Sequence, residues 1–133
     1  MEGSVTELSR YRFETGQEAL ADARLMYENG RYKNALNRAY YAIFHAIRAV
    51  NALTGFDSSK HSGVIAYFNQ NYVKTEVFPK ELSKMIRLAS ENREKADYLD
   101  FFIASKEEAE KQIQRAEAFL KVIETFLHEK EII

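Results

Sequence analysis

Four side chains of the segment 32–54 have the types and the spacing to form a catalytic or anion-binding site. Arg38, Tyr41, His45 and Arg48 follow one another at intervals of three, four and three residues, so on a helix they share one face. The two nearby cations disfavour an imidazolium, which leaves His45 neutral and able to accept a proton. The pattern fits a general base beside phosphate-binding arginines. It also fits the polar flank of a buried helix whose arginines extend to the solvent.

A second unusual position lies in the segment 79–98. The apolar residues of this segment recur at helical spacing, and Arg93 occupies one of their positions. Because an unpaired buried charge is costly, Arg93 must be paired or face a cavity. Asp97, four residues later, is the local partner. Two interpretations follow: an ion pair inside the fold, or an arginine that points into a functional cleft or a subunit interface.

The sequence offers no familiar metal or cofactor site. It has no Cys, no glycine-rich phosphate loop and no His-Glu-x-x-His motif, which excludes thiolate metal sites and cysteine nucleophiles. Its three histidines, His45, His61 and His128, are far apart in the chain and make a poor metal-binding set. We therefore expect no metal and no cofactor.

The charge is concentrated in the middle of the chain. Residues 31–93 carry ten basic and four acidic side chains, a net charge of +6, whereas residues 1–30 carry −3 and residues 94–133 carry −4. The formal net charge of −1 gives no reason to expect non-specific binding to nucleic acid. A local anion site in the central segment is allowed, and so is simple packing of oppositely charged helices.

The elements that must position these side chains are helices. Five Gly and one Pro among 133 residues are too few for a β-sandwich or a barrel. We expect helices over residues 6–28, 32–54, 61–71, 79–98 and 105–129. They predict an all-α fold, an antiparallel up-down helical bundle of four long helices plus one short helix, in a single domain over residues 1–133.

The segment 32–54 should be the central helix. One of its stripes is bulky and consists of Leu36, Tyr40, Ile43, Ile47 and Val50. The adjacent stripe consists of Ala35, Ala39, Ala42, Ala46 and Ala49. Small side chains let another helix approach closely. Farther along, Ser105 and Glu108 match a capping box that opens the last helix.

The chain should be a soluble, cytoplasmic protein with no membrane contact. No apolar run approaches the roughly 18 residues of a membrane span, and the first residues lack the apolar core of a secretion signal. The absence of Cys adds no sign of an oxidising compartment.

Three segments resemble the HEPN-domain proteins of prokaryotes. They are Asn-Arg-Ala-Tyr-Tyr-Ala-Ile-Phe-His-Ala at 37–46, Lys-His-Ser-Gly-Val-Ile-Ala-Tyr-Phe-Asn at 60–69 and Arg-Glu-Lys-Ala-Asp-Tyr at 93–98. The likeness extends over about residues 10–127. It implies an all-α bundle that forms a homodimer and acts with a minimal nucleotidyltransferase partner in a two-component module of toxin–antitoxin type.

The resemblance also implies a site. Many HEPN proteins are metal-independent ribonucleases that use an Arg-x4-6-His motif, and in the dimer two copies of the motif face one cleft. Arg93 matches the arginine of that motif, but Tyr98 stands where the histidine is expected, and a phenol is a poor general base at neutral pH. The spacing Arg-x6-His occurs at Arg38 and His45 instead, on another helix, where it can arise by chance.

The sequence leaves three functions open. The first is a nucleotide- or RNA-binding component of the two-component module. The second is a metal-independent endoribonuclease whose arginines stabilise the phosphorane charge. The third is a non-catalytic helical dimerisation module. The expected catalytic residues are Arg93, Tyr98 and His45, and the expected ligand-binding residues are Asn37, Arg38, Tyr41, Arg48 and Asp97.

Overall fold

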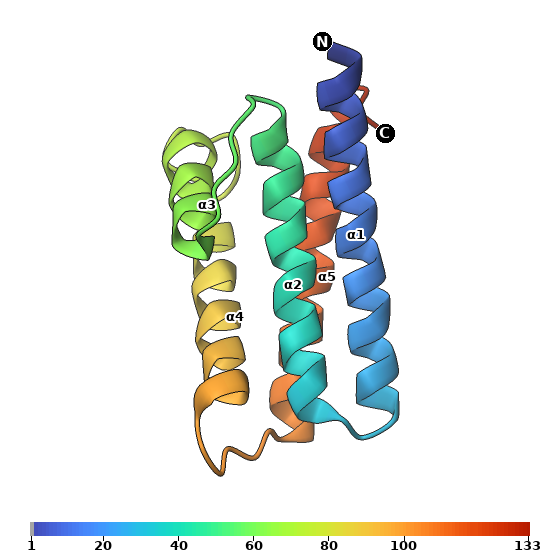
Figure 1. The fold of residues 1–133 in the computed structure, drawn as a ribbon, viewed down its shortest axis with the longest axis vertical. Coiled ribbons are helices and arrows are strands. Elements are labelled where there is room, and N and C mark those ends of the chain that lie inside the picture. Colours follow the sequence, from blue (N-terminus) through green and yellow to red (C-terminus); the bar gives the residue numbers. More distant parts are fainter. Residues whose placement is uncertain (1) are drawn as a thin grey trace.

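The computed structural model describes the backbone of residues 2–133 and the side chains of residues 4–133. Its elements are α1 (Glu2–Glu28), α2 (Tyr32–Ala52), α3 (His61–Phe68), the π-helix η1 (Asn69–Val73), α4 (Glu81–Tyr98) and α5 (Lys106–Glu129). The long helices α1, α2, α4 and α5 run alternately in opposite directions, and the short α3 lies at one end (Figure 1). The predicted all-α, antiparallel up-down bundle is confirmed.

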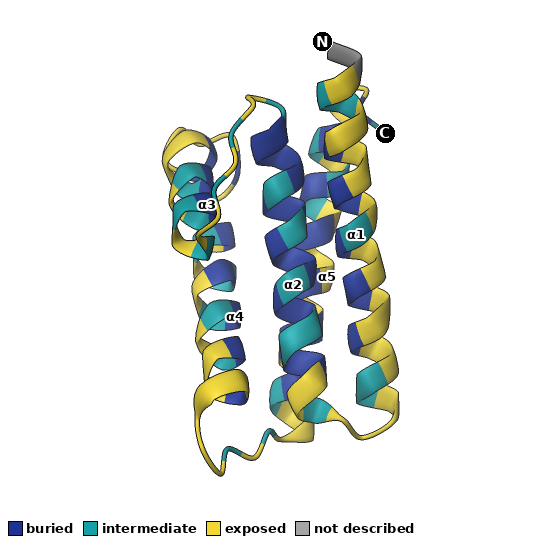
Figure 2. Cartoon of the chain, viewed as in Figure 1, coloured by how far each residue is buried: buried dark blue, intermediate teal, exposed yellow. Residues whose placement is uncertain are grey.

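Helix α2 is the centre of the bundle. It contacts α1, α3, α4 and α5, and both of its predicted stripes, the bulky one and the alanine one, are buried. The buried positions of the outer helices face inward, toward α2 (Figure 2). The alanine stripe allows α1 to come close, since a Cβ atom at Gly16 of α1 would lie only 3.0 Å from the carbonyl oxygen of Ala42.

The predicted end of α1 and the predicted start of α5 are correct, and each has a local signal in the sequence. Gly30 takes the left-handed conformation after α1, with φ of 73°. At the start of α5, the Ser105 side chain accepts a hydrogen bond from the Glu108 backbone N–H, and the Glu108 side chain accepts one from the Ser105 N–H, which completes the predicted capping box.

Elsewhere the boundaries differ from the prediction. Helix α1 begins at Glu2, ahead of the predicted start at residue 6. Helix α2 ends at Ala52 because its last turn tightens into i→i+3 bonds, such as that from the Gly55 N–H to the Ala52 carbonyl. Helix α4 begins at Glu81, after a similar turn that starts at Pro79.

The predicted helix 61–71 is α3 followed by a π-helical turn. In η1, the Lys74 N–H donates to the Asn69 carbonyl five residues earlier. This wider turn places the consecutive side chains of Tyr72 and Val73 in the core together. No helix of the described chain is long and apolar enough to span a membrane.

The close contact between α1 and α2 can be tested by overpacking the alanine stripe. We expect Ala42→Leu to lower the free energy of unfolding by about 1–3 kcal/mol, because Ala42 is fully buried and α1 leaves no room for a larger side chain. Urea denaturation measures the change. Ala21→Leu, at an exposed position of α1, is the control and should cost almost nothing. Equal effects of the two substitutions would contradict this packing.

Candidate functional site

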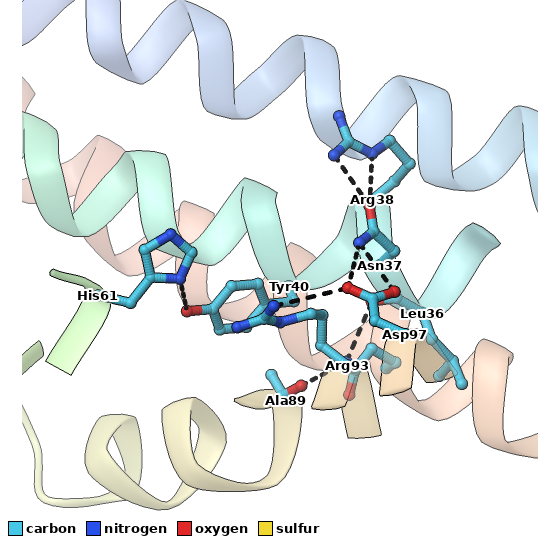
Figure 3. Close-up of polar contacts among 9 residues, drawn as sticks. Leu36, Asn37, Arg38, Tyr40, His61, Ala89, Arg93 and Asp97 are labelled. Carbon is cyan, nitrogen blue, oxygen red and sulfur yellow. Dashed lines mark hydrogen bonds and ion pairs between the residues drawn. The ribbon is translucent and has the colours of Figure 1, made fainter. Parts of the chain in front are cut away.

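Arg93 is a buried cation on the face of α4 that packs against α2. Only 8% of its surface is exposed. Its guanidinium Cζ lies 4.7 Å from the centroid of the Tyr40 ring, over that ring, and its Nη1 lies 3.5 Å from Oδ2 of Asp97 (Figure 3). Its buried Nε–H has no hydrogen-bond acceptor among the described residues. The ion pair with Asp97, one of the two interpretations that the sequence left open, is therefore present, but it leaves part of the donor capacity of Arg93 unused.

Hydrogen bonds between polar side chains join Asp97 to α2. The Asn37 amide nitrogen donates to both carboxylate oxygens of Asp97, at 3.0 and 3.2 Å. The Asn37 carbonyl oxygen accepts from Nε and Nη2 of Arg38, at 3.0 and 2.9 Å (Figure 3). These bonds fix the direction of the Asn37 amide, with its oxygen toward Arg38 and its nitrogen toward Asp97. They also hold Arg38 and Arg93, from different helices, in one connected group.

Two tyrosines lie beside these arginines. The ring centroid of Tyr41 is 5.0 Å from Cζ of Arg38 and 5.9 Å from Cζ of Arg93, so both cations flank one phenol. Tyr98, at the end of α4, has its ring centroid 5.8 Å from Cζ of Arg93 and is 75% exposed. The structure thus gathers six of the predicted site residues: Asn37, Arg38, Tyr41, Arg93, Asp97 and Tyr98.

His45 is half-buried one turn beyond Tyr41, with the two ring centroids 6.0 Å apart. Burial, followed by the charges of Arg48 and Arg38, lowers the pKa of His45 to about 4. The imidazole is therefore neutral at pH 7, as the spacing of the two arginines predicts. In this state one ring nitrogen of His45 can accept a proton.

Arg48 is engaged elsewhere. Its Nη2 lies 3.2 Å from Oδ2 of Asp57, and the same oxygen lies 3.0 Å from Nη2 of Arg12 on α1. The two cations thus hold the segment that follows α2 against α1. Arg48 also lies about 15 Å along the axis of α2 from Arg38. It does not share the group formed by Arg38 and Arg93, and its ligand-binding role stays a prediction.

His61 lies beside this site but was not among the site residues predicted from the sequence. Nδ1 of His61, the first residue of α3, lies 3.1 Å from the Tyr40 hydroxyl oxygen (Figure 3). Tyr40 was predicted as a core residue, and it is 1% exposed. The indication in the sequence was that the segment 60–69 resembles a segment of HEPN proteins. The helical periodicity of the sequence does not show that α3 packs over Tyr40.

The described residues contain no group of three or more His, Cys, Asp or Glu side chains that could hold a metal ion. The side chains around Arg93 are hydrogen-bond donors and phenols, and Asp97 supplies a carboxylate. Such a set suits an anionic ligand better than a cation.

Comparison with known proteins identifies the fold and the family of this chain. The fold is shared with the crystal structure of TT1696 from Thermus thermophilus, with a TM-score of 0.73, 20% sequence identity, and coverage of 88% of this chain and 96% of that one. The model of the HEPN domain matches residues 9–126. The chain therefore belongs to the HEPN family, which confirms the resemblance seen in the sequence.

Two relatives align with most of the chain. A "UPF0332 protein" of Thermotoga maritima is 39% identical over 113 residues, which cover 85% of this chain and 86% of that protein. A Methanocaldococcus jannaschii protein named "Putative toxin MJ0605" is 36% identical over 121 residues, which cover 87% of this chain and 86% of that protein.

The neutral state of His45 predicts a specific acid sensitivity. In the folded protein the pKa of His45 is lowered by burial from 6.5 to about 4, so between these pH values the unfolded chain binds the additional proton. Stability should therefore fall as the pH falls through this window. An NMR titration should place the His45 midpoint near pH 4, and His45→Gln should reduce the loss of stability between pH 6.5 and 4. A His45 midpoint near 6.5 would contradict this.

Proposed function

We propose that this chain is the nucleotide- or RNA-binding component of a two-component module of toxin–antitoxin type, in which it acts with a minimal nucleotidyltransferase. The observation that carries the proposal is the buried Arg93, whose Nε–H lacks an acceptor and which stands beside Arg38 at the ring of Tyr41. Membership of the HEPN family and the relative named "Putative toxin MJ0605" support the kind of module.

The energetic argument concerns the donors of Arg93. A buried guanidinium needs acceptors for its five N–H groups, and among the described residues the nearest carboxylate oxygen is 3.5 Å away. A phosphate oxygen is shaped to receive the guanidinium fork and binds it by charge-assisted hydrogen bonds. A phosphate beside the ring of Tyr41 would supply acceptors for the terminal N–H groups of Arg38 and Arg93. The exposed ring of Tyr98 offers a face on which a base can stack.

We also propose that the protein acts as a homodimer. The connection between α4 and α5 exposes large apolar side chains next to Tyr98, namely Leu99, Phe101 and Ile103. Phe101 is fully exposed and has φ of 60°, a conformation that is costly for a bulky residue. Such side chains are characteristic of an interaction surface, and a two-fold dimer is the commonest small assembly.

The alternative function is a metal-independent endoribonuclease, in which His45 would act as the base; its pKa of about 4 makes it a weak base at neutral pH. A histidine that stays neutral at pH 7 can take the proton of an RNA 2′-hydroxyl group. Arg93 and Arg38 would then stabilise the charge that develops on the phosphorane. Tyr98, in the place of the motif histidine, is the other candidate to assist the attack.

The binding proposal predicts a selective loss of affinity. ATP or a labelled single-stranded RNA should bind in EDTA at low salt and more weakly as salt rises. Arg93→Met keeps the apolar stem but removes the charge, and should weaken binding about tenfold or more; Arg38→Met should weaken it several-fold. Arg87→Met is the control, since Arg87 lies on the exposed face of α4 and pairs with Glu91. It should change the Kd less than about twofold.

The same samples separate the three functions. Cleavage of the RNA in EDTA that disappears in Arg93→Met would favour the endoribonuclease. If wild-type protein binds neither ATP nor RNA at low salt, while light scattering still gives twice the 15.4 kDa chain mass, the protein is a dimerisation module and the binding proposal is wrong. A mass near that of one chain would exclude the dimer.

A further inference from the structure

The hydrogen bond between Tyr40 and His61 connects α3 to the site on α2 and α4. His61 is half-buried, and its ring centroid lies 4.2 Å from that of Phe44 and 5.7 Å from that of Tyr41. The ring of Tyr40 lies between Arg93, whose Cζ is 4.7 Å from the ring centroid, and His61, whose Nδ1 is 3.1 Å from the hydroxyl oxygen (Figure 3). One buried phenol therefore contacts both a cation of α4 and an imidazole of α3.

The environment of Tyr40 determines which nitrogen of His61 carries the proton. Burial raises the pKa of Tyr40 to about 12, so its hydroxyl group keeps its proton at pH 7 and can donate it to Nδ1. His61 is neutral as well, because burial and the charges of Arg93 and Arg48 lower its pKa. A neutral imidazole whose Nδ1 accepts a hydrogen bond has its proton on Nε2.

The Nε2–H group is free to bind a ligand. Nε2 makes no hydrogen bond within the described residues and is not among their buried atoms without a partner, so it reaches solvent. Figure 3 shows it on the side of the ring that points away from Tyr40. The imidazole is held at Nδ1 and by the ring of Phe44, so the direction of this outer donor is fixed before any ligand arrives.

We propose that His61 is a phosphate-binding residue. Its ring lies beside the ring of Tyr41, which Arg38 and Arg93 also flank, so its Nε2–H adds a donor from α3 at the edge of their site. The inference rests on the proposed binding function and adds a residue to it. The ligand group is a phosphate, from a nucleotide or from the backbone of single-stranded RNA. In this arrangement Tyr40 is a positioning residue, because it orients His61 and supports Arg93 without reaching the ligand.

The competing explanation is that His61 only satisfies the buried hydroxyl group of Tyr40 and anchors α3. Two substitutions separate the two roles, because the side-chain amide of Asn reaches about the position of Nδ1, whereas that of Gln reaches about the position of Nε2. His61→Asn keeps a partner for Tyr40 and removes the outer donor. His61→Gln keeps an outer donor and removes the partner of Tyr40.

The two substitutions should therefore affect different properties: His61→Asn mainly the affinity and His61→Gln mainly the stability. His61→Asn should melt near the wild-type temperature and should bind ATP, RNA or both about five- to tenfold more weakly. Whichever of the two probes loses affinity identifies whether the phosphate comes from a nucleotide or from RNA. His61→Gln should melt at a lower temperature and lose less affinity. His128→Asn, at an exposed position near the end of α5, is the control and should change neither property.

The wild-type protein gives an independent readout. In ¹⁵N NMR spectra, His61 should show the Nε2–H tautomer, and addition of the probe that binds should shift the Nε2 resonance. The inference is overturned if His61→Asn binds both probes like wild type and the Nε2 resonance does not move, even though Arg93→Met loses binding. If wild type binds neither probe, the proposed function fails and this inference fails with it.

Discussion

The packing of the Arg93 guanidinium over the ring of Tyr40 sets the geometry of the site. A full charge at an apolar helix interface would be strongly destabilising without compensation, and here it is provided by a π face and by the carboxylate of Asp97. Asn37 then binds Asp97 and Arg38. The contacts of Arg93 with Tyr40 and of Asp97 with Asn37 cross from α4 to α2, while the Arg93–Asp97 pair lies within α4. Together they fix the register of the two helices and the position of the second cation.

The other side of α2 makes this arrangement possible. Its alanine stripe is fully buried, and Gly16 brings the backbone of α1 against Ala42. Since α1 and α5 already bury the apolar faces of α2, the remaining face, with Arg38, Tyr41 and His45, stays only half-buried. The helix that stabilises the fold is thereby also the helix that presents the polar groups. Changes at the alanine stripe should therefore affect stability first and binding only through the fold.

Local patterns predicted most of the fold and part of the site. The left-handed stop at Gly30 and the capping box at Ser105 depend on neighbouring residues, and Arg93 was expected to be buried because it stands in an apolar stripe. Tertiary contacts were beyond such patterns. Arg48 is held by Asp57 because the segment after α2 folds back, and His61 meets Tyr40 because α3 packs over α2. Helical periodicity describes the faces of a single helix, and neither of these contacts lies within a single helix.

The central claim is that Arg93 is buried in order to bind a phosphate and not only to pair with Asp97. A crystal structure of the protein with bound ATP or single-stranded RNA, obtained in EDTA, tests this most directly. We predict a phosphate beside Tyr41, with its oxygens within hydrogen-bond distance of the guanidinium groups of Arg38 and Arg93. A ligand bound elsewhere, with Arg93 still covered and paired only with Asp97, would contradict the account and make Arg93 a structural residue.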